Sequence, residues 1–282
     1  MSKITKIFSY CLILLLAVFV FNKTAGSASA ATSTAYDDYG LSSAAVSAKT
    51  GKLIAGKNQN VVLPLASLTK LMTAQILVGL GLNMNKEVAI TEAEVNYTLP
   101  YIAAGDVTSK IDLRVGDKVK VKDLWQAMLI ASSNEAAITL VDHSGLTRAQ
   151  FVKRMNSKAK ALGLTHTKFT EPTGIDPQNV STAKEMAIIA RHAFAYTTIS
   201  QTSASPNYRC HDLISGRLIG IYSRNNSLLA MKPVGMKVGY LTESKINVAV
   251  RLKKSGKDRI VVVLHALNNA QRNSEIGHLM GI

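Results

Sequence analysis

Ser67 and Lys70 are the two residues whose types and spacing point most directly to chemistry. They stand just before the apolar run 71–79, and at the start of a helix a spacing of three residues places both side chains on one face. A serine hydroxyl attacks a carbonyl only when a base takes its proton, and a lysine becomes such a base once burial or a neighbouring cation lowers its pKa. The pair therefore suggests acyl transfer to serine, and the alternative is an ordinary helix start with a solvated lysine.

A second pair, Ser132 and Asn134, lies at the junction of two apolar helical stretches within residues 121–142. A loop of this kind presents a hydroxyl that relays a proton and a carboxamide that orients an amide substrate. Serine and asparagine also favour helix caps and turns, so a purely structural role is the alternative. A third stretch, MKVGY at residues 236–240, precedes the last predicted strands.

The elements that must position these residues are strands at the two ends of the chain and helices in its middle. Apolar spacing of three and four predicts helices, short apolar runs bounded by turns predict strands, and Ser181 is the expected N-cap of one helix. We expect an α+β fold in which both chain ends build one antiparallel sheet and the helices are inserted between them. The strands are expected within 42–56, around the turn Lys49-Thr50-Gly51, and at 246–252 and 260–264, and the helices at 66–79, 121–142, 148–162, 182–196 and 273–282.

Residues 1–30 have the pattern of a secretory signal peptide. Lys3 and Lys6 precede an apolar core at 7–21, which is shorter than the roughly twenty residues of a membrane span, and small residues end the segment at Ala30. Cleavage there leaves 252 of the 282 residues, which suit one domain at 31–282. We therefore expect an exported protein, secreted or associated with the cell wall or membrane surface, and an uncleaved signal that acts as an anchor is the alternative.

The chain is strongly basic, with a formal charge of +15 that falls to +12 when the three lysines of the signal peptide are removed. For an exported protein, anionic wall polymers or lipid headgroups are better polyanionic partners than nucleic acid, because the sequence offers no platform of stacking aromatics. Cys210 is the single cysteine outside the signal, so no internal disulfide can form, and we interpret it as a small, partly buried hydrophobe. The dispersed histidines form no metal-ligand pattern, and we expect neither a metal nor another cofactor.

The order of the three motifs, and the segments around them, resemble the penicillin-binding D-alanyl-D-alanine carboxypeptidases, which share the serine β-lactamase-like fold. The resemblance covers most of residues 31–282 and includes PLASLTKLMTA, DLWQAMLIASSNEAA, TKFTEPTGID and STAKEMA. It implies a serine D,D-carboxypeptidase that removes the terminal D-alanine from peptidoglycan stem peptides and is inhibited by β-lactam antibiotics. Longer members add a β-rich domain and a C-terminal anchor, and because this chain ends at Ile282 we expect a short form without them.

The resemblance also implies a role for each motif residue. Ser67 would attack the carbonyl between two D-alanines, Lys70 would be its base, and Ser132 would pass a proton to the leaving amine. Asn134 would hold Lys70 and the substrate amide. The backbone N–H groups of Ser67 and Tyr240 would form the oxyanion hole.

By resemblance, Lys237 and Arg272 would bind the substrate carboxylate. Arg272 lies near the start of the last predicted helix. Gly239 matches the third family motif, but Val238 stands where the family has threonine. Valine cannot donate a hydrogen bond, and losing one such bond in a buried site costs about 1 to 3 kcal/mol, which would lower turnover by about one to two orders of magnitude. The literal Lys-Thr-Gly at 49–51 precedes the nucleophile and matches the N-terminal hairpin turn instead.

Three alternative functions stay open at this point. A D,D-endopeptidase would follow from relaxed carboxylate recognition. A β-lactamase needs rapid deacylation, but Glu171 lacks the Glu-x-x-x-Asn context of the deacylating glutamate in class A β-lactamases, and we interpret it as part of a structural loop. A wall-binding protein with a weakened site is suggested by Val238 and by the basic charge.

Overall fold

The structure, a computed structural model, describes residues 41–102 and 108–281. The predicted signal peptide, residues 1–30, lies outside the described residues. Within the described part of the chain, no helix combines the length and the apolar character that crossing a membrane requires.

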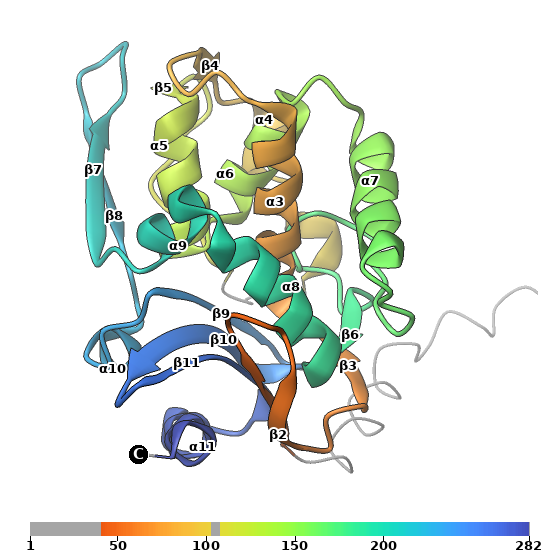
Figure 1. The fold of residues 1–282 in the computed structure, drawn as a ribbon. Helices are drawn as coiled ribbons and strands as arrows, with labels where there is room; N and C mark the ends of the chain where they lie inside the picture. Colours follow the sequence, from red (N-terminus) through yellow and green to blue (C-terminus); the bar gives the residue numbers. More distant parts are fainter. Residues whose placement is uncertain (1–40, 103–107, 282) are drawn as a thin grey trace, which may run out of the picture. The chain divides into compact units, whose positions relative to one another are not determined.

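A five-stranded antiparallel sheet joins the two ends of the chain, as predicted, in the order β2-β1-β11-β10-β9. The first strand pairs with the last, with Ser42 opposite Leu264, so segments far apart in the sequence lie side by side (Figure 1). Ser255 and Gly256, both with positive φ, make a tight turn, and the two strands that it joins are longer than predicted. The strands span Ser42–Ser47 (β1), Leu53–Lys57 (β2), Gly235–Leu241 (β9), Lys245–Lys254 (β10) and Lys257–Ala266 (β11).

Helices cover both faces of this sheet (Figure 1). On one face Ile276 and Met280 of α11 (Asn269–Met280) pack into a core with Val250 and Val261, and on the other face lies α8 (Ala183–Ala195). Because neither face meets solvent, β11 is apolar at consecutive positions rather than at alternate ones.

The inserted helical region is built around α3 (Lys70–Leu80), most of whose residues are buried. A helix buried on most sides belongs in the interior of a domain. The other helices of the described residues are η1 (Ala66–Thr69), α4 (Glu92–Val95), η2 (Leu99–Tyr101), α5 (Val121–Gln126), η3 (Ala127–Ala131), α6 (Asn134–Asp142), α7 (Arg148–Ala161), α9 (Thr197–Ser203) and α10 (Asn226–Leu229). Of these, η1, α6 and α7 contact α3, and so does α8. Three short antiparallel pairs complete the fold: β3 (Val62–Pro64) with β6 (Val180–Thr182), β4 (Glu87–Ala89) with β5 (Lys118–Lys120), and β7 (Asn207–His211) with β8 (Leu218–Tyr222).

The N-cap of α8 differs from the prediction by one residue. Thr182 caps this helix by accepting the Glu185 N–H at 3.1 Å, whereas Ser181 is paired in β6 and bonds to the Thr167 hydroxyl at 2.7 Å. Because serine and threonine are both favoured N-cap residues, the sequence could not separate two adjacent candidates. Both residues are paired in β6, and it is the Thr182 hydroxyl that accepts an N–H of the first helical turn while the Ser181 hydroxyl bonds to Thr167.

Candidate active site

Ser67 is presented by a strained turn between β3 and α3. Ala66 has a φ of 48°, in the left-handed region that residues with a side chain rarely adopt. Gly174 lies so close to this turn that a Cβ on it would be 1.9 Å from the Ala66 carbonyl oxygen. The close approach of Gly174 holds the turn in this conformation, and Ser67 remains half-buried at the border of a cleft.

Lys70 is completely buried, and its amine meets the Ser67 hydroxyl. Its Nζ donates to Ser67 Oγ at 3.1 Å, to Asn134 Oδ1 at 2.7 Å and to the Thr173 carbonyl at 2.7 Å. Burial lowers the pKa of Lys70 from 10.5 to about 8, and the negative charges of two neighbouring glutamates limit this shift. A neutral amine is therefore accessible near physiological pH, as a base for Ser67 requires.

Ser132 and Asn134 lie where the predicted helix is interrupted. Residues Ala127–Ala131 form one π-helical turn, Ser132 takes a left-handed φ of 62°, and the helix restarts at Asn134. Ser133 caps the new helix by accepting a backbone N–H at 3.0 Å. Such π turns are frequent at functional sites, and this one places Ser132 at the cleft and Asn134 on Lys70.

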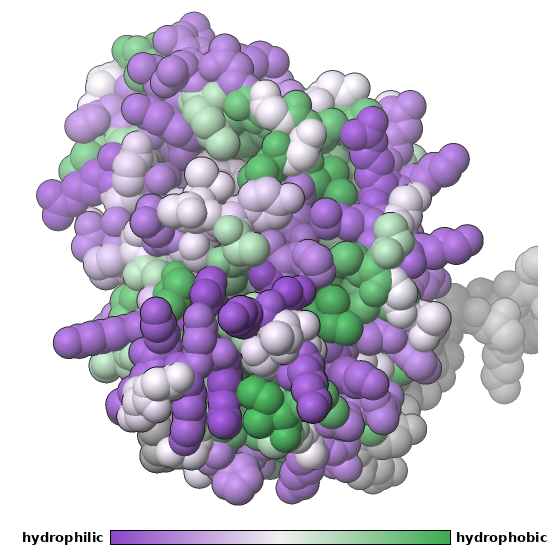
Figure 2. Space-filling model, viewed as in Figure 1, coloured by the Kyte–Doolittle hydropathy of each residue, from purple (hydrophilic) through white to green (hydrophobic). Residues whose placement is uncertain are grey.

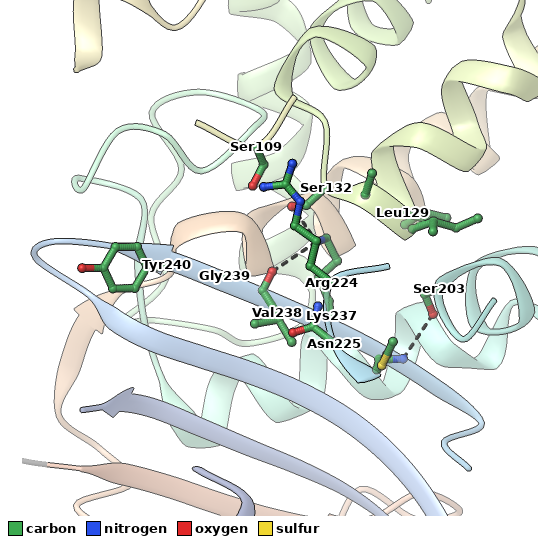
Figure 3. Close-up of a pocket in the computed structure, with 13 residues that line it drawn as sticks. Ser109, Leu129, Ser132, Ser203, Arg224, Asn225, Lys237, Val238, Gly239 and Tyr240 are labelled. Atoms are coloured by element: carbon green, nitrogen blue, oxygen red, sulfur yellow. Dashed lines mark hydrogen bonds between the residues drawn. The ribbon is translucent and has the colours of Figure 1, made fainter. Parts of the chain in front are cut away.

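Strand β9 places the amine of Lys237 beside the Ser132 hydroxyl. Its Nζ donates to the Ser132 hydroxyl at 2.7 Å and to the Val238 carbonyl at 3.2 Å (Figure 3). Burial, and then the charge of Lys70, lower the pKa of Lys237 well below its usual value. At Lys70, by contrast, the charges of Glu171 and Glu135 oppose the lowering of the pKa by burial.

Gly239 lets β9 lie directly against the backbone of the nucleophile. A Cβ at this position would be 2.7 Å from the Ser67 nitrogen and 2.9 Å from the Ala66 Cβ, closer than real side chains approach. Tyr240, the next residue, is 64% exposed and borders the same cleft as Ser67, a space of about 460 Å³. The predicted oxyanion-hole residues thus face one cavity.

Val238 and Arg272, two predicted substrate-binding residues, lie in different surroundings. Val238 borders the cleft, but it also packs against the apolar core between the sheet and α11. Arg272 is 1% exposed and donates to Ser227 and Asn273. Because its guanidinium is held by these neutral partners and does not line the clefts around the motif residues, the structure does not bring Arg272 into the site.

Arg224 was not singled out by the sequence, yet it borders both clefts around the motif residues. Figure 3 shows its side chain beside Ser109 and Ser132, at the end of the site where Lys237 lies. It is exposed, and within the described residues its guanidinium has no hydrogen bond or ion pair. A guanidinium in this position can pair with a carboxylate. A single arginine in a loop carries no sequence signal, so only the fold reveals it.

Glu171 fastens the loop that faces Lys70. It is 4% exposed and accepts hydrogen bonds from the Tyr97 hydroxyl, the Thr173 N–H and hydroxyl, the Gly174 N–H and the Asn179 amide. Through these hydrogen bonds the carboxylate stabilises its own loop, which agrees with the interpretation of Glu171 as a structural residue.

Cys210 is buried in β7, and burial raises the pKa of its thiol to about 12. The thiol therefore stays protonated at neutral pH and does not act as a nucleophile. Among the described residues, no three histidine, cysteine, aspartate or glutamate side chains are grouped as metal ligands.

Comparison with known proteins agrees with the geometry of the site. Residues 29–268 match the model of the Peptidase_S11 family, described as D-alanyl-D-alanine carboxypeptidase. The chain belongs to this family. The match includes all three motifs and the loop that carries Glu171.

Individual relatives extend this result. The chain is 31% identical to the D-alanyl-D-alanine carboxypeptidase DacF of Bacillus subtilis (strain 168) over 234 residues, which are 82% of this chain and 58% of DacF. It is 32% identical to a D-alanyl-D-alanine endopeptidase of Escherichia coli (strain K12) over 197 residues, 70% of this chain and 61% of that protein. The chain thus spans about three fifths of the length of both relatives.

A solved structure confirms the predicted fold class. A single-residue mutant of the Streptomyces K15 DD-transpeptidase superposes with a TM-score of 0.76 at 28% identity and covers 85% of this chain and 95% of its own. The α+β fold is therefore that of the β-lactamase-like and transpeptidase-like D,D-peptidases, with a sheet from both chain ends and inserted helices.

Proposed function

We propose that this protein is a serine D,D-carboxypeptidase, which removes the terminal D-alanine from peptidoglycan stem peptides through an acyl-enzyme on Ser67. The observation that carries the proposal is the buried amine of Lys70, 3.1 Å from Ser67 Oγ, with Ser132 held by Lys237 on the other side of the site. Membership of the D-alanyl-D-alanine carboxypeptidase family supports the same reaction.

The reaction proceeds in two steps. Ser67 Oγ bonds to the carbonyl carbon between the two D-alanines while neutral Lys70 takes its proton, and the oxyanion accepts from the N–H groups of residues 67 and 240. The C–N bond then breaks as the proton reaches the leaving nitrogen through Ser132, and an ester remains on Ser67. Water attacks this ester, Lys70 takes the water proton and returns one to Ser67 Oγ, and the shortened peptide leaves.

The free carboxylate of the substrate binds at the Lys237 end of the site. A carboxylate beside Lys237 favours the cationic form of this buried amine, whose pKa is otherwise lowered by burial. The exposed guanidinium of Arg224 provides a second donor there. We assign β-lactams, which carry an equivalent carboxylate, as inhibitors that acylate Ser67.

We further propose that the protein acts outside the cell after export by the signal at residues 1–30. Its substrate, the peptidoglycan stem peptide, is located there, and the basic charge of the chain favours retention at an anionic wall or membrane surface.

Mass spectrometry after incubation with penicillin, together with an assay for D-alanine freed from a D-Ala-D-Ala peptide, tests the function. We expect a penicillin adduct on Ser67 and release of D-alanine, and Ser67→Ala should lose both. Rapid turnover of penicillin without a lasting adduct would instead indicate a β-lactamase. Absence of both adduct and D-alanine release would leave a wall-binding protein without enzymatic activity.

A D,D-endopeptidase is the second candidate, favoured by one specific observation. Neither Val238 nor Arg272 provides a donor for a free carboxylate in the cleft, so its recognition depends on Lys237 and Arg224. A weaker contact with the carboxylate relaxes the selection of a terminal over an internal bond. A crosslinked peptide dimer offered beside the linear D-Ala-D-Ala peptide separates the two. Faster cleavage of the crosslinked dimer than of the linear peptide would identify the protein as a D,D-endopeptidase.

A further inference from the structure

The outer face of α7 carries basic residues without acidic partners. Lys153, Arg154 and Lys160 are exposed, and Lys158 is half-buried at the edge of the same face. We name these four residues the cationic ridge. Helix α7 contains no aspartate or glutamate, and within the described residues no ridge side chain forms an ion pair or a hydrogen bond.

The direction of the ridge follows from the packing of α7. Phe151, Met155 and Ala159 are buried on the opposite face, where α7 meets α3 and α6. Their spacing of four fixes the rotation of the helix, so Lys153 and Lys160 point away from the core. Arg154 and Lys158 lie on the flank between the core and the solvent side. Figure 1 shows α7 at the right-hand margin, and in Figure 2 hydrophilic side chains project from this margin.

Helix stability does not account for the ridge as a whole. Lys158 and Lys160 lie in the last turn, where the helix dipole favours cations. Lys153 and Arg154 lie further from that end, and Arg154 stands four residues before Lys158, a like-charge spacing that destabilises a helix. The clustering of charge in mid-helix therefore calls for another explanation.

The positive potential continues from α7 onto α8. Burial, and then the charges of Arg191 and Lys158, lower the pKa of His192, so these groups of the two helices lie within electrostatic reach of one another. Lys184, on the first turn of α8, is also exposed. The acidic residue of this turn, Glu185, is buried and bonds to Thr167 and His166 instead.

We infer that the cationic ridge is a docking surface for a linear phosphate polymer that carries neither bases nor acyl chains. This inference goes beyond the catalytic proposal and does not depend on it. Unpaired cations spread over residues 153–160, about 10 Å of helix, complement repeated phosphates on an extended chain. Residues 148–161 expose no large apolar side chain for insertion into a bilayer and no aromatic ring for stacking on bases, which argues against a membrane or a nucleic acid.

Binding of long-chain inorganic polyphosphate to the full chain tests the inference, at several salt concentrations. The ridge variant combines Lys153→Gln, Arg154→Gln and Lys160→Gln. The matched control combines Lys52→Gln, Lys57→Gln and Lys254→Gln, which removes the same charge from exposed positions outside α7 and α8. Penicillin acylation of Ser67 is measured on all three proteins as an independent readout of a folded, intact site.

We expect the ridge variant to bind at least tenfold more weakly than the control variant, and the slope of log affinity against log salt to fall by about two, since about 0.7 counterions are released per cation lost. Acylation by penicillin should be equal in all three proteins. An equal loss of polyphosphate affinity in both variants would show that only net charge matters, and it would overturn the inference. Absence of polyphosphate binding to the unmodified protein would also overturn it. Tighter binding of single-stranded DNA or of anionic phospholipid vesicles through the same ridge would overturn it in favour of those partners.

Discussion

Glu171 and Lys70 are joined through one residue, Thr173. The N–H and the hydroxyl of Thr173 both donate to Glu171 at 2.7 Å, and its carbonyl accepts from Lys70 Nζ at 2.7 Å. The glutamate thus positions the carbonyl that holds the base, and its charge raises the pKa of the same base against the effect of burial. A buried residue that lines neither cleft therefore influences both the position and the protonation of Lys70.

Glu171→Gln should move the pH midpoint of penicillin acylation to lower pH, because removing the negative charge lets burial depress the Lys70 pKa further. The variant should also lose about 1 to 3 kcal/mol of unfolding free energy, since an amide cannot accept every donor that the carboxylate accepts. Acylation rates across pH and denaturant unfolding measure the two effects. Glu185→Gln, which changes a second buried carboxylate, in the first turn of α8, is the matched control and should lose stability without moving the midpoint. An unchanged midpoint in Glu171→Gln would refute the electrostatic role.

The acylation rate of the unmodified protein should rise with pH through a midpoint near 8. Lys70 accepts the Ser67 proton only as a neutral amine, and burial lowers its pKa to about 8, so the reactive fraction grows as the pH passes this value. Adduct formation followed by mass spectrometry gives the profile, with Ser67→Ala as the blank at each pH. A rate that falls over the same range would exclude Lys70 as the base.

Gly239→Ala should slow acylation by about two to three orders of magnitude, the usual cost of losing one oxyanion-hole donor. The new Cβ would lie 2.7 Å from the Ser67 nitrogen, so β9 must move away from the nucleophile. The rate of adduct formation tests this. Gly79→Ala, a helical position where a Cβ meets nothing within 4 Å, should acylate at the normal rate and unfold at slightly higher denaturant. Normal acylation by Gly239→Ala would show that the strand does not border the oxyanion.

Val238→Thr should raise the rate of D-alanine release by about tenfold to a hundredfold, because it restores a hydroxyl donor for the carboxylate. It should lower the unfolding free energy by about 1 kcal/mol, since Val238 also packs against the core beneath the sheet. Val238→Ala separates the two effects, as it loses packing without gaining a donor. Turnover that rises equally in both variants would show that the missing hydroxyl is not what limits the reaction.

The elements that the sequence predicted well are those with a strong local pattern. Helix α7 has apolar residues at helical spacing, and the strands β1, β10 and β11 are short apolar runs bounded by turns, and all lie within a few residues of their predicted bounds. The hairpin β7–β8 and strand β9 were not predicted as strands. Strand β9 contains two glycines and a lysine, which disfavour a strand, and its pairing with β10 stabilises it. The same limit applies within the site, where the π turn before Ser132 depends on its packing and not on its composition.

The sequence by itself determined the three short motifs that contain Ser67 and Lys70, Ser132 and Asn134, and Lys237, because residue types and short spacings are local properties. Their order along the chain, through its resemblance to the family, predicted that these residues form one set. Only the tertiary structure decided that Lys70 is buried between Asn134 and the Thr173 carbonyl, that Arg272 is engaged away from the clefts, and that Arg224 borders them. The physical reason is that pKa values and the reach of a side chain depend on desolvation and on partners far apart in the chain, which form only when the loops close on the sheet.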